Sequence, residues 1–147
     1  MKWFRALAIP FLASVAMAGS ASAGQGGQVT VQMHGMRNSD GQVLCALFKG
    51  AKGFPDGEAA LKGGRTTVKD GKANCSFKRL EPGTYAVGVI HDEDGDAEMD
   101  TVLGIPTEGF GFSNNAKPGM FGPPAFKEAA FRVGAGTKSL VIKMLYL

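Results

Sequence analysis

The stretch TTVKDGKANCSFKRLEPGTYAVGVIH, residues 66–91, contains the signals that decide the fold. Asp70-Gly71 is a strong signal for a two-residue hairpin turn. Residues 73–77 alternate between apolar and polar side chains, which is the period-two pattern of a half-buried strand. Pro82-Gly83 marks a second turn, and residues 84–91 are apolar enough for a further strand. The stretch therefore predicts short strands joined by tight turns.

The same pattern extends to both sides of this stretch. Upstream, one segment alternates with period two and the next is a continuous apolar run, as in a central strand. Two more short apolar segments close the chain, and no segment has the pattern of a long amphipathic helix. Seven strands are predicted in all, near residues 29–33, 43–48, 66–68, 73–77, 84–91, 129–133 and 139–145. This is typical of a single all-β domain over residues 24–147, a seven-stranded β-sandwich of Ig-like or transthyretin-like type.

Residues 1–23 have the layout of a secretory signal peptide. Two basic residues precede an apolar run over residues 6–18, and Ala21-Ser22-Ala23 provides a small-residue cleavage site. We therefore expect a periplasmic or secreted protein with no membrane span after cleavage. Removing Lys2 and Arg5 from the 16 basic residues leaves 14 against 13 acidic ones, with no basic run interleaved with aromatics. Such a chain is not expected to bind nucleic acid.

Two cysteines, Cys45 and Cys75, lie in the exported part of the chain. An even number of cysteines in an exported protein favours a disulfide. We therefore expect Cys45 and Cys75 to be bonded, with two buried free thiols as the alternative.

The segment over residues 92–127 has no predicted strand, and it begins with an acidic half. Residues 92–100 contain six acidic side chains and no basic one. Their spacing follows positions 1, 3, 5, 7 and 9 of an EF-hand calcium loop, which correspond to Asp92, Asp94, Asp96, Glu98 and Asp100. Position 6 is Ala97 instead of Gly, and position 12 is Leu103 instead of Glu, so we expect a weak Ca²⁺ site with a Kd of about 10⁻⁴–10⁻³ M. The alternative is a solvated acidic turn.

The second half of this segment is rich in Gly, Pro and Phe. Its large apolar side chains are too many for a solvated linker, so we expect it to fold over one end of the sandwich, like an Ω-loop. It either packs on itself or forms a ligand or docking surface with amide groups. The residues considered for such a surface are His91, Glu108, Phe110, Phe112, Asn114, Asn115, Phe121 and Phe126.

Several runs of sequence resemble a known bacterial family. They are LEPGTYAV at residues 80–87, HDEDGD at 91–96, GIPTEGFGFSNN at 104–115 and FGPPAF at 121–126. With these runs, essentially the whole exported chain resembles the exported DUF2141 family. This resemblance implies an exported β protein but carries no established activity.

The motifs favour a non-catalytic module that binds calcium and docks a small ligand or an envelope protein. The motifs of serine hydrolases and nucleotide-binding proteins are absent. The alternatives are a hydrolase that uses His91 and nearby carboxylates, and a purely structural envelope protein. A hydrolase that pairs Glu108 with an acid from residues 92–100 is also chemically possible. A zinc site would need His34, His91 and Asp92 to meet.

Overall fold

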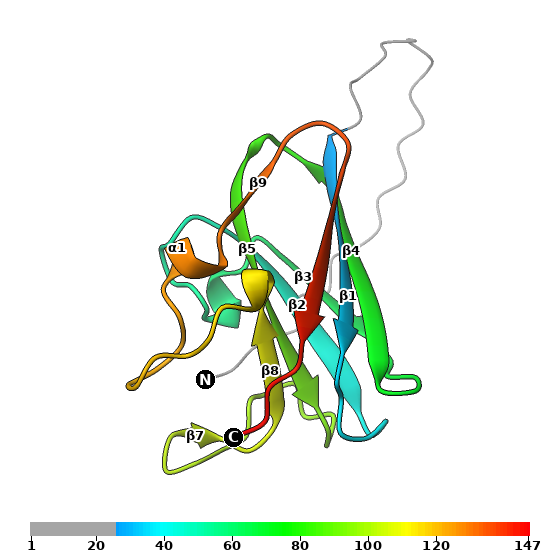
Figure 1. Cartoon of the computed structure of the whole chain (residues 1–147), viewed down its shortest axis with the longest axis vertical. Coiled ribbons are helices and arrows are strands. Elements are labelled where there is room, and N and C mark those ends of the chain that lie inside the picture. Colours follow the sequence, from blue (N-terminus) through cyan, green and yellow to red (C-terminus); the bar gives the residue numbers. More distant parts are fainter. Residues whose placement is uncertain (1–25) are drawn as a thin grey trace, which may run out of the picture.

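Two main β-sheets and a small two-stranded hairpin make up residues 26–147, the part of the chain that the structure, a computed structural model, describes (Figure 1). The smaller sheet has the strand order β10-β1-β4, and the larger has the order β3-β2-β5-β8, with β9 paired to the first residues of β5. The strands are β1 (Gly27–His34), β2 (Gln42–Lys49), β3 (Lys62–Thr66), β4 (Lys72–Leu80), β5 (Gly83–Asp92), β8 (Gly109–Phe112), β9 (Phe131–Val133) and β10 (Thr137–Lys143). The all-β fold is therefore confirmed. The predicted signal peptide, residues 1–23, lies outside the described residues.

The main core lies between the two sheets. Every second residue of β1 faces inward, as the alternation predicts, so Val29, Val31 and Met33 are buried. They pack with inward-facing residues of the larger sheet, such as Val43 and Val87, in one cluster. Burial of such side chains is the main favourable contribution to folding, at about 1.5–3 kcal/mol each.

The outer face of the larger sheet is also covered, which explains why β5 is an unbroken apolar run. The short helix α1 (Phe126–Ala129) and the loop around Phe54 lie over this face (Figure 1). The ring of Phe54 meets the rings of Phe48 and Phe126 edge-on, with centroids 5.1 and 5.7 Å apart. Strands buried on both faces lose the period-two pattern because both sets of side chains are apolar.

The prediction of no strand over residues 92–127 is wrong. Two short strands, β6 (Thr101–Val102) and β7 (Ile105–Pro106), form a hairpin, and β8 then adds an edge strand to β5. A short 3-10 turn, η2 (Ser113–Asn115), follows. The glycines of β8 hid it: adding a Cβ to Gly109 or Gly111 would place it 2.5 or 2.6 Å from a neighbouring side chain, so tertiary packing requires glycine here.

The turn at Asp70-Gly71 forms as predicted, but it does not join two paired strands. Both residues have positive φ, 52° and 69°, and Lys69 bridges to Lys72 across them. The strand before this turn, β3, lies at residues 62–66 and pairs with β2, whereas β4 pairs with β1. The turn therefore carries the chain from one sheet to the other, which a local signal does not reveal.

The predicted disulfide is wrong: Cys45 and Cys75 are free thiols. They lie on β2 and β4, in different sheets, and both contact the core between the sheets. A hydrogen bond with the Cys75 thiol, together with burial, raises the pKa of the Cys45 thiol far above its ordinary value. A thiol in such surroundings stays protonated and behaves as a small apolar group.

Candidate metal centre

The acidic loop, residues 92–100, leaves the end of β5, and Asp92 organises its first turn. The Asp92 side chain is fully buried. Its Oδ1 accepts a hydrogen bond from the Gly95 backbone N–H (2.9 Å), and its Oδ2 accepts from the Ala97 N–H (3.0 Å) and from Nε2 of Gln42 (2.7 Å). Aspartate readily forms such turns with nearby backbone. Asp92 therefore fixes the path of the loop from its first residue.

The alternating aspartates continue the turn. Asp94 Oδ1 accepts from the Asp96 N–H (3.1 Å), and Asp96 Oδ1 accepts from the Glu98 N–H (2.8 Å). Ala97, at position 6 of the predicted calcium loop, has φ of +65°. The left-handed turn that usually needs glycine is thus formed with alanine, at an ordinary cost of about 1–2 kcal/mol.

Glu108 closes the loop from the far side of the β6–β7 hairpin. Its Oε1 accepts from the Glu93 N–H (2.8 Å) and its Oε2 from the Asp100 N–H (3.2 Å), so one carboxylate holds both ends of the acidic segment. Glu108 is only 3% exposed. The sequence pattern places Glu108 in the Phe-rich second half of the segment, residues 104–126, which we call the aromatic loop. The hairpin turn at Leu103-Gly104, where both φ values are positive, brings it here, and Gly104 is a weak sequence signal for that turn.

Two groups of carboxylates converge within the described residues. Oxygens of Asp92, Asp94 and Asp96 lie within 4.8 Å of one another, and so do oxygens of Asp94, Asp100 and Glu108. Oxygens on one Ca²⁺ lie 2.3–2.6 Å from the ion, so pairs at this spacing are compatible with a shared ion. Asp94 belongs to both groups. The carboxylate of Glu98, the remaining predicted ligand, belongs to neither.

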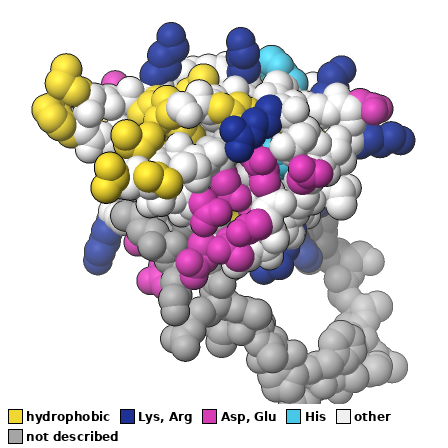
Figure 2. Space-filling view, turned by 90° about the horizontal axis from the view of Figure 1, so that it is seen from below, with side chains coloured by type: hydrophobic (Ala, Val, Ile, Leu, Met, Phe, Trp, Pro, Cys, Tyr) yellow, Lys and Arg dark blue, Asp and Glu magenta, His cyan; other side chains and the backbone are white. Residues whose placement is uncertain are grey.

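The clustered charges raise the pKa values of two carboxyl groups. Loss of hydration raises the pKa of Asp100, and the neighbouring acids, beginning with Asp94 and Asp96, raise it further. Burial also raises the pKa of Glu108, against the lowering effect of its two backbone hydrogen bonds. Figure 2 shows the acidic side chains gathered on one end of the molecule. A bound cation would relieve this repulsion.

Glu93 is part of the acidic stretch but not of either group. It forms an ion pair with Arg37, with nitrogen and oxygen 2.8 Å apart, and accepts a hydrogen bond from Asn38 (3.0 Å). Burial acts to raise the pKa of Glu93, but these hydrogen bonds and the charge of Arg37 outweigh it and hold the pKa below its ordinary value. Glu93 therefore anchors the loop to the β1–β2 connection.

His91 is enclosed in the fold, and both of its ring nitrogens are occupied. Its side chain has no exposed surface. Nε2 lies 2.8 Å from the Asp40 carbonyl oxygen, which can only accept, so Nε2 carries a proton; Nδ1 lies 2.7 Å from the Tyr146 hydroxyl. A general base must reach the proton that it removes. The geometry therefore does not support a hydrolase built on His91.

Most of the aromatic loop packs on the protein itself. Phe110 and Phe112 are buried and Phe126 is half-buried, so these rings are not free to form a ligand surface. Asn114 donates to the Glu128 and Ala130 carbonyls, and Asn115 donates to the Val141 carbonyl and accepts from the Lys143 N–H. Both amides thus bind the backbone. Of the predicted docking phenylalanines, only Phe121 is fully exposed, at 95%.

Ser113, which the sequence did not single out, fastens this loop to β5. Its hydroxyl is fully buried, accepts from the Val87 N–H (2.9 Å) and donates to the Ala129 carbonyl (2.5 Å).

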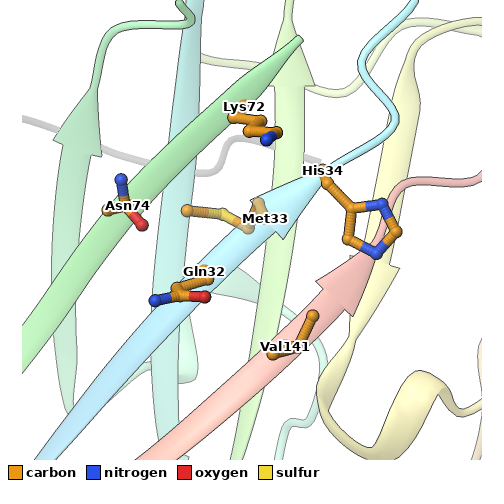
Figure 3. Close-up of a pocket in the computed structure, with 6 residues that line it drawn as sticks. All are labelled: Gln32, Met33, His34, Lys72, Asn74 and Val141. Atoms are coloured by element: carbon orange, nitrogen blue, oxygen red, sulfur yellow. The ribbon is translucent and has the colours of Figure 1, made fainter.

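A shallow hollow lies elsewhere, on the outer face of the smaller sheet (Figure 3). It measures about 510 Å³, is open to solvent, and is lined by Gln32, Met33, His34, Lys72, Asn74 and Val141. The two histidines are thus separated, since His34 faces solvent here while His91 is enclosed. Neither belongs to a group that could hold a metal in residues 26–147. The structure gives no support to the zinc alternative.

The comparisons with known proteins identify a family. No curated protein and no solved structure matches the chain. In the described part, no helix has the length and apolar character needed to cross a membrane. Residues 31–141, which include the whole acidic loop, match the family model described as an uncharacterized protein conserved in bacteria, DUF2141, so the chain belongs to the DUF2141 family.

Proposed function

We propose that this protein is an exported, non-catalytic β-sandwich module that binds Ca²⁺ at the acidic loop. The observation that carries the proposal is that two clusters of carboxylates share Asp94. The proposed Ca²⁺ ligands are the side chains of Asp92, Asp94, Asp96, Asp100 and Glu108. The signal-peptide pattern of residues 1–23 supports export.

The donor set favours calcium over other metals. All the side-chain donors are oxygens, whereas zinc sites in proteins are usually built from Cys and His. Mg²⁺ requires strict octahedral geometry, while Ca²⁺ accepts six to eight oxygens in a flexible arrangement such as a loop provides. Leu103, at position 12, offers no ligand and is almost fully exposed. Glu108 replaces the missing carboxylate from outside the twelve-residue loop, and Glu98 contributes its backbone carbonyl, as position 7 does in EF-hands.

Thermal unfolding tests this proposal directly. For a Kd of about 10⁻⁴–10⁻³ M, calcium at about 10 mM stabilises the folded state by about 1.4–2.7 kcal/mol. This corresponds to a rise in Tm of about 4–12 °C for a domain of this length. The protein comprising residues 24–147 is compared in EDTA, in CaCl₂ and in NaCl of the same ionic strength. A rise in NaCl equal to that in CaCl₂ contradicts the proposal.

A double variant assigns the effect to the loop. Asp94→Asn with Asp96→Asn keeps both Oδ1 atoms that accept backbone hydrogen bonds, so the turn survives while two charges are lost. We expect the calcium-induced rise in Tm to disappear. Asp70→Asn, which removes an exposed acid from a turn outside the acidic loop, is the control and should keep the rise. An unchanged rise in the double variant rejects the loop as the site.

A further inference from the structure

Three sulfur-bearing side chains meet in the core between the two main sheets. Met33 on β1 and Cys45 on β2 belong to one buried cluster, and Cys75 on β4 packs against it. The Sγ of Cys45 lies 3.9 Å from the Sδ of Met33, and the thiols of Cys45 and Cys75 are hydrogen-bonding partners. Cys45 therefore contacts both of the other sulfur groups.

The arrangement of these sulfurs suits a shared metal ion. Zinc–thiolate bonds are about 2.3 Å long, and two sulfurs bound at that length to one trigonal ion lie about 4 Å apart. The distance of 3.9 Å between Cys45 and Met33 agrees with this spacing. The register of β1 and β4 makes Met33 and Cys75 diagonal neighbours on the inner face of the smaller sheet. Three strands from two sheets thus supply three sulfur ligands.

An opening at the edge of the sandwich leads to these sulfurs. Gly64 on β3 is paired with Cys45, so its missing side chain would point inward on the same face as the Cys45 thiol. A Cβ at Gly64 would meet no atom within 4 Å, so open space lies beside Cys45. Gly64 and Cys75 are both half-buried, and their strands, β3 and β4, lie in contact at the edges of their sheets. An ion therefore has a route from solvent to the thiols.

The donor set favours Cu⁺ over Zn²⁺. Thiolate and thioether ligands select monovalent copper, whereas zinc takes four ligands from Cys, His and carboxylates. Within residues 26–147, neither cysteine belongs to a group of three such residues that could hold a metal. Zinc would therefore lack half of its usual ligands, while a trigonal Cu⁺ ion would have all three.

The charge balance of the bound state is also acceptable. Cu⁺ and two Cys–SH groups give a copper bis(thiolate) of net charge −1 and two released protons. A coordinating thiol is deprotonated outright, so the raised pKa of Cys45 in the metal-free protein makes binding pH-dependent without preventing it. Lys62 crosses the same β3–β4 edge, where its ammonium group donates to the Lys78 carbonyl (2.6 Å), and its positive charge favours an anionic complex nearby.

We propose that Met33, Cys45 and Cys75 form a buried binding site for Cu⁺. The two thiolates hold the ion, and the Met33 thioether is the third ligand. The ion stays monovalent throughout, so binding needs no oxidant or reductant. The site uses no side chain of the acidic loop and is independent of the calcium binding proposed above.

Competition with the coloured Cu⁺ chelator bicinchoninate tests the inference. The reduced protein, residues 24–147, is titrated into Cu⁺–bicinchoninate without oxygen, and we expect it to withdraw one equivalent of copper. An excess of Zn²⁺ should not displace this copper. X-ray absorption at the copper edge should show sulfur ligands at about 2.3 Å and no nitrogen or oxygen ligand.

Two variants assign the copper to this site. Cys75→Ser should weaken Cu⁺ binding by about 100-fold or more, since even changes to groups outside the ligands cost about 10–100-fold in metal affinity. Met33→Leu conserves the volume of the core and should weaken binding by about 10-fold or more. Met144→Leu, which changes a buried methionine of the same core outside this trio, is the matched control and should bind as the wild type does. Urea unfolding without copper checks that each variant folds, and Met33→Leu carries the test if Cys75→Ser does not.

The outcomes also separate this inference from the proposed function. The double variant Asp94→Asn with Asp96→Asn should lose the calcium effect but bind Cu⁺ normally. If the folded wild type withdraws no copper, the inference is overturned and the calcium site stands. Wild-type copper affinity in a folded Met33→Leu or Cys75→Ser variant, or nitrogen and oxygen ligands in the absorption spectrum, would place the copper elsewhere and also overturn the inference.

Discussion

Replacing Glu108 with glutamine tests whether one buried carboxylate holds the acidic loop together. Both carboxylate oxygens accept backbone N–H groups, one at each end of the acidic segment. Glutamine has a single acceptor oxygen, and its amide nitrogen would face the second N–H. An unpaired polar group in a buried site costs about 1–3 kcal/mol. The substitution also removes a negative charge from a site where burial raises the pKa of Glu108, so we expect a net loss of about 1–2 kcal/mol.

Urea unfolding in EDTA measures this loss in the absence of metal. The midpoint should fall with an unchanged m-value, and Tm should fall by about 3–10 °C. In calcium, the variant should also show a smaller stabilisation than the wild type, since it lacks one ligand charge. Glu128→Gln is the control: Glu128 is exposed and uses one oxygen to accept from the Ala125 N–H (2.7 Å), which glutamine reproduces. If Glu108→Gln matched the wild type in both EDTA and calcium, the assignment of Glu108 as a brace and ligand would be refuted.

Three further predictions concern Ser113, Gly41 and the pH dependence of the calcium effect. Ser113→Ala leaves a buried N–H and a buried carbonyl unpaired and should cost about 2–4 kcal/mol in urea unfolding, so wild-type stability would contradict the role of Ser113 as a fastener. Gly41→Ala would put its Cβ 1.9 Å from the Asp92 carbonyl oxygen at a φ of +62°, so both Tm and the calcium-induced rise should fall, and retention of both would contradict this crowding. The calcium-induced rise in Tm should shrink as the pH falls, because protons then compete with the metal for Asp100 and Glu108. Since the folded-state pKa values of both carboxyl groups are raised, this loss should begin above their ordinary pKa values of 3.8 and 4.5. In EDTA those same protonations should add stability, since a raised carboxyl pKa disfavours the charged form in the fold, and a calcium effect constant over this range would argue against these ligands.

The sequence predicts a strand correctly where the residues of that strand alone show an alternating or continuous apolar pattern. The alternation in β1 and the apolar run of β2 predict their burial because side chains point alternately to the two faces of a sheet. The strand β8 could not be found in this way, because its glycines are explained only by neighbours from distant parts of the chain. The prediction of a disulfide failed for a related reason. An even number of cysteines says nothing about the distance or orientation of Cys45 and Cys75 in the fold.

The sequence by itself determined the acidic turn, because its hydrogen bonds join residues two to five positions apart, from Asp92 to the Glu98 N–H. Such contacts depend on local chain geometry and on the short aspartate side chain. Only the tertiary structure decided that Glu108 joins this turn, that His91 is enclosed, and that Phe121 projects while other rings of its loop are buried. These outcomes depend on the register of hairpins and the packing of two sheets, which bring together residues that no short-range pattern connects.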